Sequence, residues 1–157
     1  MRLEIHYSYK CNQDCVFCPV LRHPKEDPKL NDLLLVLNNI RDGDRVDISG
    51  GEPLLRKDVS KLAKAISKKT KDIYVTTNAI LLTKSFIENL INSGVNKFLI
   101  SFHSHDPQIL KKITGRSSFN KIVKNLKLLS SYDVEIITNT IITKYNAKTL
   151  VDTIKFL

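Results

Sequence analysis

Short β-rich runs alternate with amphipathic helical repeats along the whole chain, and this alternation restricts the fold more than any other feature of the sequence. Runs rich in β-branched and aromatic residues, predicted as strands, cover 2–8, 46–49, 72–78, 97–103 and 134–142. Between them, apolar residues recur with the period of a helix. These repeats cover 30–37, 59–66, 86–91 and 119–129. Strands that alternate with helices pair in parallel, which predicts a doubly wound sheet or a (β/α) barrel.

Residues at the predicted helix ends agree with this pattern. Asp27 precedes Pro28, Asp58 precedes the second apolar repeat, and Thr83 precedes the third, so each is predicted to cap a helix. Gly94 follows the third repeat, where a glycine commonly ends a helix. The residues between 19 and 28 form the longest irregular connection.

Composition indicates an ordinary globular domain. The chain has 157 residues, of which 42% are hydrophobic and 26% charged, so it is long enough for one domain with a real core. We expect a cytoplasmic protein, because no apolar run is long enough to span a membrane and the N-terminus lacks a signal-peptide pattern. The net charge of +9 comes largely from lysines opposite the apolar stripes. A basic RNA-binding module stays a weak alternative, since no aromatic-basic repeat is present.

The unusual residues follow the predicted strands directly. CNQDCVFC, residues 11–18, comes after the first strand, and GGEP, residues 50–53, comes after the second. Asn78 ends the third strand, and 101–105 end the fourth. Because the carboxyl ends of parallel strands meet at one edge of a sheet or barrel, we expect a shared functional site there.

The chain's three cysteines, Cys11, Cys15 and Cys18, all lie in the first of these segments. Disulfides fit poorly, because the count is odd and a cytoplasmic compartment is reducing. A structural zinc site with His23 as fourth ligand is an alternative. An iron-sulfur cluster explains the crowding better, because one loop can offer a thiolate to three of its irons. The fourth iron would then be open to a substrate or cofactor.

The spacing Cys11-x3-Cys15-x2-Cys18, with Phe17 before the last cysteine, resembles the cluster loop of the radical S-adenosylmethionine (radical SAM) superfamily. SGGEPLL at 49–55 resembles the GGE motif of that family, and both motifs stand in the family's order. The resemblance implies a partial (β/α) barrel of the radical SAM type, with about five parallel strands and helices outside.

By this resemblance, the three cysteines bind a [4Fe-4S] cluster and S-adenosylmethionine (SAM) binds its open iron. Reductive cleavage of SAM would give a 5′-deoxyadenosyl radical that takes hydrogen from an unidentified substrate. The alternative is a non-catalytic iron-sulfur or zinc-binding module for electron transfer or structure. The implied partners are a one-electron donor such as a flavodoxin or ferredoxin, and a substrate that is a small molecule, a peptide or RNA.

The resemblance also assigns residues to SAM. Gly50, Gly51 and Glu52 would meet its amino group, and Phe17 would lie at its adenine. The residues expected to reach its ribose or carboxylate are Asn78, Ser101 and Asn139, with Arg116 as a further carboxylate partner.

Other polar residues are candidates for substrate contact. Glu4, His6 and Ser8 share one face of the first strand by alternation, which predicts a wet cavity under the cofactor. His103 and His105 follow the fourth strand and are candidates for substrate contact or proton transfer.

The end of the chain suggests an incomplete core. A helix is predicted from near Asn146, and its apolar stripe runs to Leu157 without a capping residue. The resemblance implies six strands, whereas five are found. We therefore expect residues 1–157 to form a radical SAM core that lacks its last βα unit, with an apolar patch beside an unpaired fifth strand.

Overall fold

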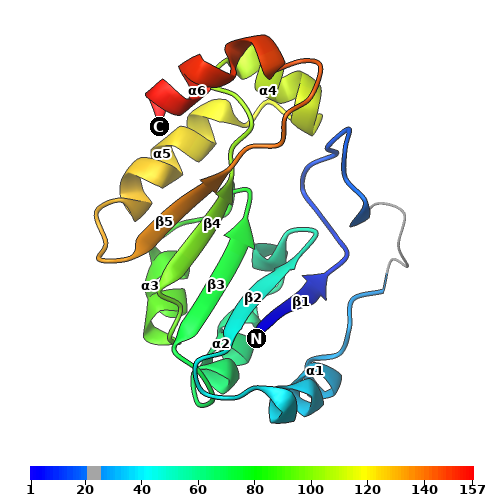
Figure 1. Ribbon diagram of the computed structural model, residues 1–157, viewed down its shortest axis with the longest axis vertical. Helices are drawn as coiled ribbons and strands as arrows, with labels where there is room; N and C mark the ends of the chain where they lie inside the picture. The colour runs from blue at the N-terminus through cyan, green and yellow to red at the C-terminus, as the bar shows by residue number, and fades with distance from the viewer. Residues whose placement is uncertain (21–25) are drawn as a thin grey trace.

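The computed structural model describes residues 1–20 and 26–157, and its centre is a single parallel sheet (Figure 1). The strands are β1 (Arg2–Ser8), β2 (Arg45–Gly50), β3 (Asp72–Thr77), β4 (Lys97–Ser101) and β5 (Glu135–Asn139). They pair in chain order, β1-β2-β3-β4-β5, and each pairing is parallel. β1 and β5 therefore form the two edges of this sheet.

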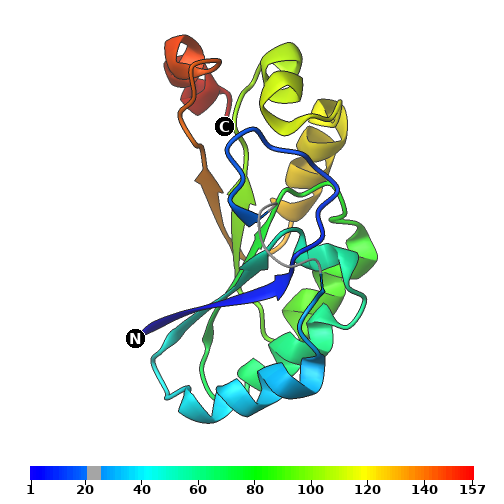
Figure 2. The same ribbon diagram turned by 90° about the vertical axis from the view of Figure 1, so that its right-hand side faces the viewer.

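The helices are α1 (Leu30–Val36), α2 (Val59–Ile66), α3 (Lys84–Asn92), α4 (Pro107–Thr114), α5 (Phe119–Leu129) and α6 (Leu150–Phe156). Figure 2 shows α2, α3 and α5 along one side of the sheet. A doubly wound sheet reverses its strand order and carries helices on both faces. The unreversed order confirms the other prediction, a partial (β/α) barrel with its helices outside.

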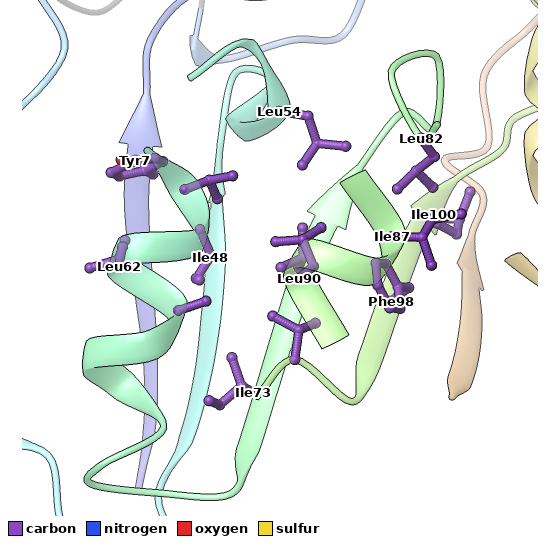
Figure 3. Close-up of a cluster of buried hydrophobic side chains, with 14 of the residues drawn as sticks. Tyr7, Ile48, Leu54, Leu62, Ile73, Leu82, Ile87, Leu90, Phe98 and Ile100 are labelled. Atoms are coloured by element: carbon purple, nitrogen blue, oxygen red, sulfur yellow. The ribbon is translucent and has the colours of Figure 1, made fainter. Parts of the chain in front are cut away.

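The hydrophobic core lies between the sheet and its helices (Figure 3). Successive side chains of a strand point to opposite faces, so alternate residues of each strand enter this core. On β2, Ile48 is fully buried among them, and Leu62 and Leu90 meet the sheet from α2 and α3. The residues between the core positions face the opposite, inner side of the sheet.

The inner side carries a layer of ion pairs near the amino ends of the strands. Asp47 on β2 accepts hydrogen bonds from Arg2 on β1 at 2.6 Å and from Arg45 at 2.8 Å. The Arg45 guanidinium also lies 3.6 Å from the ring centre of Tyr74 on β3. Lys97 on β4 continues the layer with ion pairs to acidic residues of β3 and β5. This end of the inner face is thus occupied by charges that already have partners.

The helix ends follow the predicted caps only in part. Thr83 caps α3 by accepting a hydrogen bond from the Phe86 amide, and Gly94 follows that helix with φ of 98°. Asp27 does not cap α1, because its carboxylate accepts from the Tyr9 amide at 2.7 Å instead. α4 was not among the predicted helices, although Asp106 caps it by accepting from the amides of Gln108 and Ile109.

In the described ranges, no helix has both the length and the apolarity needed to cross a membrane.

Candidate functional site

The cysteine loop, residues 11–18, follows β1 and is fastened to the carboxyl end of α4. The amide of Asp14 donates to the carbonyl of Thr114, and the amide of Val16 donates to that of Ile113, each at 2.9 Å. Both acceptors belong to the last turn of a helix, where carbonyls have no partner within the helix. The loop thereby satisfies that helix end and takes a fixed position from it.

The turn after α4 holds the same loop from a second direction. Gly115 has φ of 70°, and a β-carbon there would lie 3.1 Å from the Cβ and the carbonyl oxygen of Asp14. The side-chain Nε2 of Gln13 donates to the hydroxyl of Ser118 at 3.5 Å. A glycine at this turn therefore lets the loop approach closely.

The three thiols are partly buried and lie close enough to affect one another. Burial is the main cause that raises the pKa of Cys11, and nearby Glu52 and Cys18 raise it further. Burial also raises the pKa of Cys15 to about 12, with smaller contributions from Cys11 and Cys18. These raised pKa values favour the protonated form of both thiols. A positive metal centre would favour the thiolates instead, because cysteine binds metal in its thiolate form.

Their arrangement bears on which metal group they could hold. Within residues 1–20 and 26–157, no three His, Cys, Asp or Glu side chains are grouped so as to hold one metal ion. His23, the fourth ligand of the zinc alternative, lies outside the described residues. In an iron-sulfur cluster each cysteine binds a different iron, so its thiols need not converge on a single point. The donor set therefore fits a cluster.

The paired glycines bring the end of β2 against the start of the cysteine loop. A β-carbon on Gly50 would lie less than 3.0 Å from the carbonyl oxygen of Ser8, and one on Gly51 less than 3.0 Å from that of Lys10. The Gly51 amide donates to Ser8 at 2.6 Å, and the Glu52 amide donates to Lys10 at 2.8 Å. The closest approach that these glycines permit is thus to the protein's own backbone.

Asn78, at the end of β3, joins this assembly through its side chain. Its amide group donates to the Asn12 side chain at 2.6 Å and lies 3.9 Å from the sulfur of Cys11. The loop after β3 is therefore tied directly to the first cysteine.

These segments enclose a cavity of about 400 Å³ at the carboxyl ends of the strands. Most residues singled out by the sequence line it: Cys11, Cys15, Cys18, Phe17, Gly50, Gly51, Asn78 and Ser101. One wall is thus made of thiols and another of glycine backbone and polar side chains.

Known proteins that resemble this chain indicate the same kind of site. A family model for the Radical SAM superfamily matches residues 5–157. The chain belongs to the radical SAM superfamily. The family prediction is therefore confirmed, and with it the cofactors that radical SAM enzymes use, a [4Fe-4S] cluster and SAM.

Individual relatives are about a third identical to this chain over the aligned residues. It is 31% identical over 160 residues to the molybdenum cofactor biosynthesis protein moc-5 of Caenorhabditis elegans, covering 96% of this chain and 26% of that protein. It is 31% identical over 151 residues to the GTP 3',8-cyclase of Campylobacter jejuni strain RM1221, covering 90% of this chain and 47% of that protein. The chain thus spans less than half of either relative.

A solved structure shows the same fold. The crystal structure of Streptococcus suis SuiB bound to S-adenosylmethionine superposes with a TM-score of 0.81 at 25% identity, and it covers 99% of this chain and 37% of SuiB. The structural similarity therefore extends over the whole sheet and its helices.

Three residues expected at SAM lie away from the cavity wall: Glu52, Asn139 and Arg116, which is exposed. The Glu52 side chain is fully buried and accepts hydrogen bonds from the Thr77 hydroxyl at 2.8 Å and from the amides of Leu54 and Asn78. Burial raises its pKa to about 7 in spite of these donors. Asn139 is exposed, and its carbonyl accepts from the amide of Phe102.

β1 departs from the predicted alternation. Glu4 and His6 line the cavity as expected, and Glu4 accepts a hydrogen bond from the Ser49 hydroxyl at 2.6 Å. Ser8 is buried outside the cavity wall, because the pairing with β2 shifts between His6 and Ser8. Such an irregularity turns the following side chain away from the face that alternation predicts.

His103 forms part of the cavity wall together with Phe17. The two rings meet edge to face at 5.0 Å, and burial lowers the His103 pKa to about 4. Nδ1 lies 3.3 Å from the Ile141 amide, so the neutral ring carries its hydrogen on Nε2. His105 instead contacts Thr153 of α6, outside the cavity wall.

Some residues of the site were missed. Gln13 and Ile141 line the cavity, and Asn12 connects Cys11 to Asn78. Gln and Asn are common in any loop, and Ile141 fell in the apolar run predicted as a strand over 134–142, so no signal in the sequence marked them as site residues. Thr76 was detectable, because it alternates with Asn78 along β3.

Proposed function

We propose that this chain carries the catalytic core of a radical SAM enzyme, holding a [4Fe-4S] cluster through Cys11, Cys15 and Cys18 and SAM in the adjoining cavity. One observation carries the proposal. The three thiols and the backbone of Gly50 and Gly51 open onto the same cavity, although they come from different βα units.

The chain's own residues fix the relative position of these two groups. The cysteine loop is bonded to α4, and Ser8 and Lys10, which lead into the loop, accept hydrogen bonds from the Gly51 and Glu52 amides. Gly50 and Gly51 line the cavity without side chains, so the amino and carboxylate groups of SAM can approach the backbone there. Asn78 and Ser101 add side-chain partners on the same wall. Glu52 lies outside the cavity wall and joins the end of β2 to the end of β3 through its hydrogen bonds.

Held by Cys11, Cys15 and Cys18, the cluster would supply the electron for reductive cleavage of SAM, which is the radical chemistry by which hydrogen would be taken from the substrate. The rings of Phe17 and His103 form a wall suited to a flat adenine. The electron donor we propose is a flavodoxin or ferredoxin.

For the substrate, the relatives' names make GTP the first candidate. The described residues of the cavity wall include the carboxylate of Glu4 but no Lys or Arg side chain. Arg45 and Lys97 lie toward the amino ends of the strands, where acidic partners hold them. Because phosphates are bound mainly by such cations or by clustered amides, GTP would place its guanosine part against this wall.

The first test is anaerobic reconstitution with iron and sulfide. We expect about four irons and four sulfides per chain, with absorption that bleaches on dithionite, and loss of this species when Cys11, Cys15 or Cys18 is replaced by alanine. Stoichiometric zinc without iron uptake would instead support the structural zinc module.

The second test compares two asparagines. N78A removes a residue of the cavity wall, whereas N139A alters one that lies outside it. Adding SAM to the reduced protein should change its electron paramagnetic resonance (EPR) spectrum, and N78A should raise the SAM concentration required while N139A should not. A spectrum that SAM leaves unchanged would favour the electron-transfer module.

The third test addresses the substrate. With SAM and dithionite, the complete protein should form 5′-deoxyadenosine faster when GTP is present than when it is absent. An equal rate would exclude GTP but leave SAM cleavage standing, because that step needs only the cluster and SAM.

A further inference from the structure

The turn after β3 contains a residue in an unusual backbone conformation. Ala79 has φ of 62° and is fully buried, and it is the one described non-glycine residue with a positive φ. An alanine in the left-handed region is disfavoured because its β-carbon crowds the neighbouring carbonyl oxygen. Something in the surrounding structure must therefore hold the turn.

Asn125 of α5 holds this turn through hydrogen bonds. Its side-chain amide donates to the carbonyl of Ala79 at 2.7 Å and to that of Ile80 at 3.1 Å. The residue is 8% exposed, and the other buried residues of its helix, Ile122 and Leu129, are apolar. A buried asparagine that bonds two carbonyls of one turn fixes the direction of both peptide groups.

The same turn determines where Asn78 points. The Ala79 amide donates to the Thr77 hydroxyl at 3.1 Å, and the Asn78 amide donates to Glu52 at 2.9 Å. Asn78 then directs its side chain to Asn12 and toward the sulfur of Cys11. The contacts form an unbroken series from α5 to the cysteine loop.

We propose that Asn125 is a positioning residue of the cofactor site, which holds Ala79 in its left-handed conformation and thereby aims Asn78 at the cysteine loop. The part of this proposal that concerns cofactors rests on the proposed function. The part that concerns the turn can be measured without any cofactor.

The first measurement is hydrogen exchange by mass spectrometry on the cofactor-free chain. N125A should speed exchange in the peptide that covers 77–82 about tenfold, since two hydrogen bonds to the turn are lost. N120A is the matched control, because Asn120 is an exposed asparagine of the same helix. Exchange in β2 should stay the same in both variants, which separates a local opening from general destabilisation.

The decisive variant is A79G. Glycine adopts a positive φ without strain, so A79G should slow the opening of the turn about tenfold and return the N125A/A79G protein to near the original exchange rate. If N125A does not fold, comparing A79G with N125A/A79G still measures the effect of removing the Asn125 side chain. Exchange at 77–82 that does not respond to N125A, or that A79G fails to restore, would overturn the proposal.

The second measurement uses the reconstituted protein. N125A should raise the SAM concentration that half-completes the change in the reduced EPR spectrum, because a smaller fraction of the protein then holds Asn78 in the direction that SAM requires, and A79G should restore it. A loss that A79G does not restore would contradict positioning through the turn. If the unaltered protein takes up no cluster, the proposed function fails, and the exchange results still decide the role of Asn125.

Discussion

Replacing Gly51 by alanine should push the end of β2 away from residues 8–10, which lead into the cysteine loop. The added β-carbon would lie less than 3.0 Å from the carbonyl oxygen of Lys10, which is a backbone atom with no flexible end to move aside. The two backbone segments must move apart until this contact is relieved. That movement acts on the hydrogen bonds from Gly51 to Ser8 and from Glu52 to Lys10.

The cost can be worked from these contacts. Weakening two backbone hydrogen bonds costs about 1 kcal/mol each. Forcing extra volume into a packed site costs about 1–3 kcal/mol more. The sum, about 3–5 kcal/mol, is a large share of the roughly 5–15 kcal/mol that stabilises a domain.

Urea unfolding of the cofactor-free protein, followed by circular dichroism, measures this loss. G43A is the matched control, because Gly43 has φ of 80° but nothing within 4 Å of an added β-carbon. Its alanine should cost only about 1 kcal/mol of backbone strain. If G51A lowers the free energy of unfolding by no more than G43A does, the inference that Gly51 serves close approach between backbones is refuted.

Three further predictions concern titration. The Glu52 pKa is raised from 4.5 to about 7, so the folded protein should lose on the order of 3 kcal/mol as the pH rises between these values. Urea unfolding should show this slope in the original protein and not in E52Q, and equal slopes would contradict it. The His103 pKa is lowered from 6.5 to about 4, so the opposite trend is expected: stability is complete above pH 6.5 and falls by about 3 kcal/mol toward pH 4. H103Q should lack that fall, and a fall of the same size in H103Q would assign it to other groups. In the cofactor-free protein, Cys15, with a pKa of about 12, should react with iodoacetamide at pH 8 far more slowly than free cysteine, and mass spectrometry would disprove this if the rates match.

Much of the site could be predicted because it depends on local sequence order. Alternating strand and helix patterns require parallel pairing, and parallel strands bring their carboxyl ends to one edge. The cysteine loop, the glycine pair and Asn78 each follow a strand, so their convergence on one cavity followed from the pattern. The spacing of the three cysteines added the family, which no periodicity could supply.

The tertiary structure decided which side chains face that cavity. A shifted pairing in β1 turns Ser8 away from it, and Glu52 is directed to the end of β3 by donors on a neighbouring strand. The hold of Asn125 on the turn at Ala79 spans 46 residues of sequence. Such contacts depend on register and on distances between elements, whereas sequence patterns report the period of each element alone. For this protein, the sequence therefore determined where a cofactor site would form, and packing determined which groups take part in it.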